Sequence, residues 1–497
     1  MNAFHPGQLV MVDIQGKSLD LATAEFLRAN QVRAVCLFRK NLGTEAEVRQ
    51  LTADLRNVMG PTALIGLDQE GGSVVRATFL PQAPSAMALG AADDAALAEE
   101  VGAAVARGLR SIGINWNFAP VLDINNNPAN PVIAERSFSE DADDVTRLAG
   151  AWMAGSLREG VACCVKHFPG HGDTHVDSHL ALPTVDKSRA ELDALELRPF
   201  KAFCHQSGDE APAVMTAHIV YPQIDPEHPA TLSKKILGDI LRREWGYDGV
   251  VITDALMMKA IFERYGYARA AVMAIDAGAD MILAQGDLEE QGKSIQALKD
   301  AFASGELSAE QGRIACARLD KLAAAYPVRH DDYQGEPRAA DDQLMRQAWA
   351  RGLTALRGAK APARDAKLRV FVQPEVPTDG VSEAGPSGQQ IVALFANFPQ
   401  AEIRFVDDIL ALDWAQLPPA EAGTLNIVAS THRMRYGANA KTWQPDLHLV
   451  LWNPFQALDV PGPTVVSWGY ADGALAGLQA WLEGRVEATA QSPVSLG

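Results

Sequence analysis

Short apolar runs alternate with helix-forming segments through the first 330 residues of the chain. Each run has the length of a buried strand, and the segments between them have helical spacing and good helix formers. Strict alternation of strands and helices implies parallel strands. Sustained this far, it favours a (β/α)₈ TIM-type barrel over an open doubly wound sheet, two folds that periodicity alone does not separate. The runs lie at 32–38, 63–67, 112–118, 161–165, 213–217, 249–253 and 280–284.

A polar, proline-bearing segment after Tyr326 separates a second unit from the first. We expect a barrel domain at 1–330, then a linker with a connecting helix at 331–365. A smaller C-terminal α/β sandwich domain is predicted at 366–487, followed by a flexible tail at 488–497. Its expected strands lie at 368–373, 403–407, 425–429, 447–452 and 464–468.

The composition is that of a globular protein with an acidic surface. Hydrophobic residues make up 47% of the chain and charged residues 21%, with a formal net charge of −18. Such a surface repels phosphate backbones and anionic membranes, so we expect neither nucleic acid nor membrane as a partner. The five cysteines show no CxxC spacing and are most simply free thiols of a reducing compartment. With no signal-like N-terminus and no run long enough to span a bilayer, we expect a cytoplasmic protein.

One segment, residues 166–179 (KHFPGHGDTHVDSH), concentrates four histidines, two aspartates and a lysine. Histidines four residues apart would share one helix face, as metal ligands can. Pro169 and the neighbouring glycines disfavour a helix, so we expect a loop that offers imidazoles and carboxylates to a cleft. We therefore predict no metal and no cofactor. A zinc-dependent hydrolase remains an alternative, and its ligands would be His167, His171, His175 and His179.

Polar residues follow the predicted strands of the first domain. They are Asp68, Lys166 with His167, His218 and Asp254. In a parallel barrel the carboxyl ends of all strands open on one face, so these side chains should converge. For any single one of them, a strand-end cap or a salt bridge is the simpler explanation. For the whole set, an active site is the better one.

Three further features suggest chemistry. Asp254 leaves a continuous apolar strand, which suits a rigid nucleophile or the stabiliser of a cation, although a helix N-cap is the simpler alternative. Asp177 and His179 form an Asp-x-His pair in which the carboxylate could orient the ring for proton transfer, although such a pair is often a plain surface feature. Arg136 could clamp an oxygen-rich ligand or pair with Glu135 or Asp141.

Together these motifs resemble glycoside hydrolase family 3, in its bacterial β-N-acetylglucosaminidase branch. The resemblance covers about residues 5 to 330, and KHFPGHG followed by DSH marks this branch rather than the family at large. The family resembles the predicted architecture, with a barrel that bears the site and an optional C-terminal α/β domain. The matching segments are LDQEGGSVVR (67–76), INWNFAPVLDI (114–124), ERSFSED (135–141), KHFPGHGDTHVDSHLALP (166–183), VMTAHIVYP (214–222) and GVVITDALMM (249–258).

The resemblance implies a retaining exo-enzyme that removes terminal β-linked N-acetylglucosamine through a covalent glycosyl-enzyme. At the matching positions, Asp254 would be the nucleophile and His179, held by Asp177, the acid/base. His218 also matches a family position, without a defined role. The residues that would bind the sugar are Asp68, Arg76, Arg136, Lys166 and His167.

A histidine acid/base also leaves alternatives open. A neutral imidazole does not repel an anionic acceptor, so phosphorolysis or a broader β-glycosidase activity is possible. The expected substrate is a small N-acetylglucosaminyl sugar, such as a muropeptide fragment in peptidoglycan recycling, and the protein could be a monomer or a homodimer. A non-catalytic sugar-binding protein is a further alternative.

Overall fold

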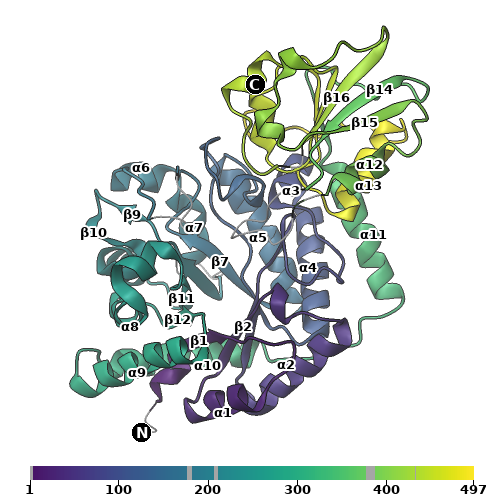
Figure 1. Ribbon diagram of the computed structural model, residues 1–497. Coiled ribbons are helices and arrows are strands. Elements are labelled where there is room, and N and C mark those ends of the chain that lie inside the picture. The colour runs from purple at the N-terminus through teal and green to yellow at the C-terminus, as the bar shows by residue number, and fades with distance from the viewer. Residues whose placement is uncertain (1–3, 176–181, 206–210, 376–384, 386, 431) are drawn as a thin grey trace.

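The chain folds into two α/β domains (Figure 1). The computed structural model describes residues 4–175, 182–205, 211–375, 385, 387–430 and 432–497. The larger, N-terminal domain is a barrel surrounded by helices. The smaller domain lies over one end of it, next to α3 and α11.

Eight parallel strands form a closed barrel in the order β1-β12-β11-β8-β7-β6-β3-β2. The barrel closes because β1 pairs in parallel with both β2 and β12. This confirms the predicted TIM-type fold. Seven of the eight strands overlap the predicted apolar runs, whereas β1 was not predicted; nearly every strand residue is buried. The strands are β1 (Val10–Asp13), β2 (Ala34–Leu37), β3 (Leu64–Leu67), β6 (Trp116–Asn117), β7 (Ala162–Phe168), β8 (Ala213–Thr216), β11 (Val250–Ala255) and β12 (Met281–Ala284).

Helices cover the outside of the barrel, and their ends follow local sequence signals. In α2, Thr44 and Glu47 form a capping box, and the helix stops at Gly60, whose φ is 90°. The helices are α1 (Leu21–Ala29), α2 (Glu45–Met59), α3 (Ala86–Ala92), α4 (Ala95–Ser111), α5 (Ala142–Arg158), α6 (Arg189–Ala194), α7 (Leu197–Cys204), the π-helix η5 (Lys234–Glu244), α8 (Lys259–Ala277), α9 (Leu288–Ser304) and α10 (Ala309–Ala325).

The barrel domain also contains two short β-hairpins that are separate from the barrel sheet. One joins β4 (Gln69–Gly71) to β5 (Val74–Val75), and the other joins β9 (Val220–Tyr221) to β10 (Asp225–Pro229). The first turns through Gly71 and Gly72, whose φ values are 109° and 61°. A Cβ at Gly71 would lie 2.2 Å from the carbonyl oxygen of Pro84, so the glycine allows the hairpin to approach the segment before α3 closely.

The second domain is built on a six-stranded sheet in the order β13-β18-β17-β16-β14-β15. All of its pairs are parallel except β13 with β18. Strand β13 lies within 331–365, so this stretch, expected to be only a linker and helix, also supplies an edge strand. The elements are α11 (Glu336–Arg351), β13 (Thr354–Leu356), β14 (Lys367–Val372), α12 (Gly388–Leu394), β15 (Ala401–Phe405), β16 (Thr424–Ser430), β17 (Leu447–Val450), β18 (Thr464–Val466) and α13 (Asp472–Leu482).

The last ten residues differ from the expected flexible tail. Val494 and Leu496 are buried in an apolar cluster with Met87 of α3 and Trp349 of α11. The backbone carbonyl of Pro493 accepts hydrogen bonds from two residues of the barrel domain. The segment packs here because its apolar side chains, Val494 and Leu496, are buried at the junction between the two domains.

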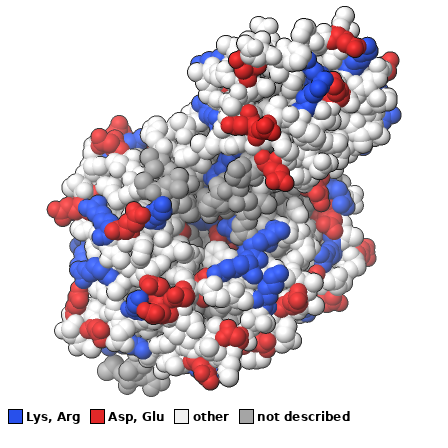
Figure 2. Space-filling model, viewed as in Figure 1, with Lys and Arg blue, Asp and Glu red and all other residues white. Residues whose placement is uncertain are grey.

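Acidic and basic side chains are interspersed on the surface shown in Figure 2. All five cysteines are free, as predicted, and all are buried. Among the described helices, none has the length and apolar character needed to cross a membrane.

Candidate active site

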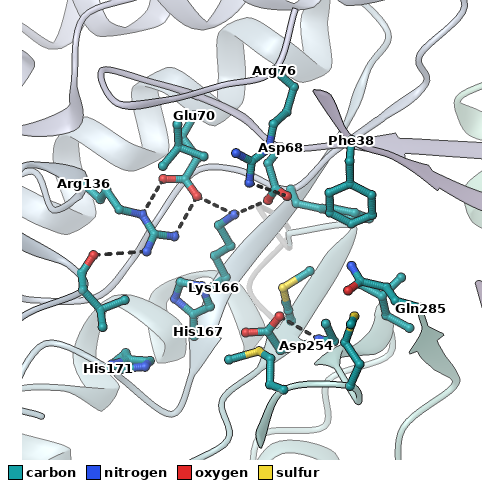
Figure 3. Close-up of a pocket in the computed structure, with 18 of the residues that line it drawn as sticks. Phe38, Asp68, Glu70, Arg76, Arg136, Lys166, His167, His171, Asp254 and Gln285 are labelled. Carbon is teal, nitrogen blue, oxygen red and sulfur yellow. Dashed lines mark hydrogen bonds and ion pairs between the residues drawn. The ribbon is translucent and has the colours of Figure 1, made fainter. Parts of the chain in front are cut away.

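A cavity of about 400 Å³ opens at the carboxyl ends of the barrel strands (Figure 3). Asp68 follows β3, Lys166 and His167 lie near the end of β7, and Asp254 lies near the end of β11. These strand-end residues converge as the parallel topology predicts. Arg76, which follows β5, and Arg136, at the end of the 3-10 helix η3 (Ala134–Arg136), also line the cavity. The other lining residues include Phe38, Glu70, Val74, Phe118, Val132, His171, Met215, Met257, Met258, Lys259 and Gln285.

Lys166 lies at the centre of one wall of the cavity. Its Nζ is 2.7 Å from Oδ1 of Asp68 and 2.5 Å from Oε1 of Glu70. Arg76 adds a second cation, 3.7 Å from Oδ2 of Asp68. Burial lowers the pKa of Lys166, but the charges of Asp68 and Glu70 outweigh it and raise the pKa overall. The ammonium therefore stays charged in a site that solvent barely reaches.

Glu70 links Lys166 to Arg136. The guanidinium of Arg136 donates two hydrogen bonds to the Glu70 carboxylate, at 2.9 and 2.8 Å. Burial alone would raise the pKa of Glu70, but Arg136 and Lys166 hold it well below its usual range. Sequence reasoning missed Glu70. The available signal was its place in the DQEGG segment, directly before the two glycines that shape the hairpin.

His167 is oriented by a buried carboxylate, Asp123. The Nδ1 of His167 lies 2.6 Å from Oδ2 of Asp123, and Oδ1 accepts the backbone N–H groups of His167 and His171. Although burial raises the pKa of Asp123, the charge of His167 and these hydrogen bonds lower it overall, so the group is an ionised acceptor. Nδ1 therefore carries a proton, which leaves Nε2 as the second hydrogen-bonding atom of the ring. Sequence reasoning did not identify Asp123.

The other histidines of the loop have separate environments. His171 lines the cavity, and burial, with the nearby charge of His167, lowers its pKa to about 4, so it is neutral at pH 7. His175 is exposed, with Nδ1 3.2 Å from the side-chain nitrogen of Asn127. Within the described residues, no group of three or more His, Cys, Asp or Glu side chains is arranged to hold a metal ion. His179, the fourth member of the metal hypothesis, lies outside these residues, as does Asp177.

Asp254 lies across the cavity from Lys166 (Figure 3). Its Oδ1 accepts the backbone N–H of Ala255 at 2.7 Å, which fixes the carboxylate at the end of β11. It is not the cap of the next helix, since α8 begins at Lys259 with Met258 in the N-cap position. The simpler explanation of Asp254 as a helix cap therefore does not apply.

His218 lies behind Asp254 and is fully buried. Its Nε2 is 3.0 Å from the carbonyl oxygen of Ala255, and its Nδ1 is 2.8 Å from Oγ1 of Thr231. His218 therefore holds the backbone next to Asp254. The prediction that it would converge with the other strand-end side chains is wrong, since it is not among the residues that line the cavity.

Comparisons with known proteins agree with this architecture. The model of the glycosyl hydrolase family 3 N-terminal domain matches residues 5–322. A beta-hexosaminidase from Pseudomonas aeruginosa is 34% identical over 354 residues, which cover 71% of this chain and 98% of that protein. Beta-hexosaminidase A from Pseudoalteromonas piscicida is 36% identical over 332 residues, and the match spans 61% of this chain and only 55% of that protein.

A solved structure extends the likeness to both domains. It is a glycoside hydrolase family 3 beta-N-acetylglucosaminidase from Paenibacillus sp. str. FPU-7, with a TM-score of 0.88 and 33% sequence identity. The superposition covers 99% of this chain and 98% of that chain, so the two proteins share the second domain as well as the barrel.

Proposed function

This chain belongs to glycosyl hydrolase family 3 and is a glycoside hydrolase, and we propose that it removes terminal β-linked N-acetylglucosamine from small sugars. The names of its relatives support this substrate. The observation that carries the proposal is the placement of Asp254 across one cavity from the charged groups around Lys166. About 400 Å³ lies in the range of small-ligand sites and is enough room for one sugar ring, which fits removal of a single terminal unit.

The charged wall would bind the hydroxyl groups of the sugar. Lys166, Asp68 and Arg76 offer donors and acceptors that are already fixed by their mutual ion pairs. Hydrogen bonds to ionised groups are roughly twice as strong as neutral ones. Because these groups are held before the substrate arrives, little ordering is needed on binding. His167 would present Nε2 to the same ring, since Asp123 occupies Nδ1.

Asp254 would act as the nucleophile of a retaining, two-step reaction. Its carboxylate attacks the anomeric carbon as the bond to the leaving oxygen breaks, and a glycosyl-enzyme ester forms. In the second step the oxygen of a water molecule replaces Asp254, and free N-acetylglucosamine results. The hydrogen bond from Ala255 orients the carboxylate for this attack.

The acid/base would be His179, oriented by Asp177. In the first step the ring gives a proton to the leaving oxygen, and in the second it takes one from the attacking water. Both residues lie outside the described part of the chain. His171, in the same loop, lines the cavity, which supports this assignment.

The finer assignments are also proposals. Residues 1–330 would form the catalytic domain, 331–365 the connection, 366–487 the supporting domain and 488–497 the terminal segment. The biological substrate would be a muropeptide fragment, hydrolysed in the cytoplasm during peptidoglycan recycling by a monomer or homodimer. Incubation with anhydromuropeptide, chitobiose or an aryl β-glucoside, with and without phosphate, tests this. Release of N-acetylglucosamine from the muropeptide is expected, and accumulation of the sugar 1-phosphate would instead indicate phosphorolysis.

The main test replaces the nucleophile. We expect Asp254→Asn to lose at least about 1,000-fold in turnover of p-nitrophenyl β-N-acetylglucosaminide, which corresponds to about 4 kcal/mol of transition-state stabilisation. The matched control is Asp248→Asn, an exposed aspartate just before the amino end of the same strand, paired with Arg318. It should keep wild-type turnover. Undiminished activity of Asp254→Asn would overturn the assignment, and inactivity of the wild type on this substrate would overturn the proposed function.

A further inference from the structure

The segment Val132–Arg136 brings Arg136 to the cavity. Two side chains of the second domain donate hydrogen bonds to this segment. Val132 and Arg136 line the cavity. The contacts from the second domain come from the loops after β16 and β17. The carboxyl ends of these strands therefore face the loops at the carboxyl ends of the barrel strands, where the cavity lies.

The first contact is made to Glu135, the neighbour of Arg136 in the chain. Trp452, which follows β17, donates a hydrogen bond from Nε1 to Oε1 of Glu135 at 3.0 Å. Ser73, in the turn of the β4–β5 hairpin, donates to the same oxygen at 2.5 Å. Glu135 thus joins the second domain to the hairpin that carries Glu70. Both Glu135 and Trp452 are buried.

The second contact is made to the backbone of the same segment. Arg433, which follows β16, donates from Nη2 to the carbonyl oxygen of Val132 at 2.9 Å. The same oxygen accepts from Nη1 of Arg136 at 3.3 Å. One carbonyl therefore connects a guanidinium of the second domain to a guanidinium of the cavity. Arg433 is itself fixed, because Asn453 donates to its backbone oxygen at 2.7 Å.

The charges in this junction make it sensitive to the loss of either partner. Burial raises the pKa of Glu135, while the charge of Arg433 and the hydrogen bonds from Ser73 and Trp452 oppose that rise. A buried carboxylate that loses a donor must move or take up a proton, because its desolvation is otherwise uncompensated. Either change would shift Arg136, which is the next residue.

We propose that Arg433 and Trp452 of the second domain are positioning residues of the sugar site. They fix Val132–Arg136 and thereby the line of ion pairs from Arg136 through Glu70 to Lys166. The inference rests on the proposed function, since it assigns the sugar to this cavity. It gives the second domain a part in substrate binding, although neither residue is among those that line the cavity.

The test uses Trp452→Phe, which keeps an aromatic ring and removes the donor, and Arg433→Met in the full-length chain. We expect each to raise KM for the aryl N-acetylglucosaminide, and the inhibition constant of free N-acetylglucosamine, by about fivefold or more, while kcat changes less than about twofold. KM should change more than kcat because the substitutions shift the sugar-binding wall but leave the nucleophile Asp254 in place. Arg433→Lys, which keeps the charge, should recover part of the loss.

Two control variants separate positioning from general stability. Trp468→Phe removes an equivalent indole donor of the second domain, which binds the carbonyl oxygen of Gly352 at 2.7 Å. Arg435→Met removes a nearby guanidinium that pairs with Asp459. Both should leave KM and the inhibition constant unchanged even where they lower the melting temperature.

A double variant tests the route through Glu135. In a Glu135→Gln background the side chain no longer needs a cation, so Arg433→Met should raise KM less than it does in the wild type. The inference is overturned if Trp452→Phe and Arg433→Met leave KM unchanged, or if Trp468→Phe raises it equally. A wild type that does not cleave the substrate would instead contradict the proposed function.

Discussion

The two walls of the cavity differ in how they hold charge. On one side, Lys166 and Glu70 belong to a continuous line of ion pairs, so each charge is neutralised by a fixed neighbour. On the other, Asp254 lies among methionine side chains and accepts a backbone hydrogen bond. The difference suggests a division of labour. The first wall can bind hydroxyl groups without rearranging, while the second presents the carboxylate of Asp254 beside methionine side chains.

Apart from Asp254→Asn, the largest effect should come from breaking the charged wall at its centre. Lys166→Met leaves the partly buried carboxylate of Asp68 and the more deeply buried one of Glu70 without the cation between them. We expect a loss of about 3 to 5 kcal/mol in the free energy of unfolding. We also expect at least about a 100-fold loss in kcat/KM. Urea titration and steady-state kinetics measure the two.

Lys293→Met is the matched control for this change, because Lys293 forms ion pairs on the exposed surface of α9. It should leave both the free energy of unfolding and the kinetics close to those of the wild type. Equal stability losses in the two variants would mean that the charged wall is held no more firmly than a surface ion pair.

A smaller, pH-dependent effect should come from His171, beside the charged wall. Burial lowers its pKa to about 4 in the folded protein, against about 6.5 in the unfolded chain. As the pH falls below about 6.5, the unfolded chain takes up the proton first, so stability is lost until the folded pKa is reached. Between pH 7 and pH 5 this amounts to about 2 kcal/mol.

The variant His171→Asn should lack this contribution, because asparagine does not titrate and can still hydrogen-bond Thr174. Urea titrations of both proteins at pH 7 and pH 5 measure the difference. If the wild type and the variant lose the same stability over this range, then His171 is not held neutral and the charged wall extends further than we infer.

The smallest effect should come from the methionine wall. Met257 is 42% exposed at the cavity and contributes volume rather than a specific bond. Met257→Leu should change the free energy of unfolding by less than about 0.5 kcal/mol. It should also leave kcat within about twofold of the wild type. A large fall in kcat, with KM unchanged, would show that the thioether acts on the reaction itself and that the two walls differ less than their charges suggest.

The sequence predicted the candidate site residues best where they lie at the ends of barrel strands. Asp68, Lys166, His167 and Asp254 follow apolar runs, and the parallel topology brings such positions together without knowledge of side-chain contacts. The barrel itself followed from the same alternation. The three-residue strand β13 carried too short a signal to be separated from a linker.

Glu70 and Asp123 escaped prediction because their importance lies in partners distant along the chain. Glu70 pairs with Arg136, 66 residues away, and Asp123 with His167, 44 residues away. The same holds for Arg433 and Trp452, which act across a domain junction. A local sequence pattern does not indicate which residues of two domains will be in contact, since domain packing depends on the shapes of both folded units.

The burial of all five cysteines has a practical consequence for labelling. Desolvation raises the pKa of Cys163 to about 12 and that of Cys316 to about 11, so few of these thiols are ionised at neutral pH. Because the thiolate is the reactive form, native cysteines should resist alkylation while the protein is folded. A cysteine introduced at an exposed position such as His175 would react far ahead of them. It would allow a fluorophore to be attached at the entrance of the loop before Asp177 without removing any native thiol.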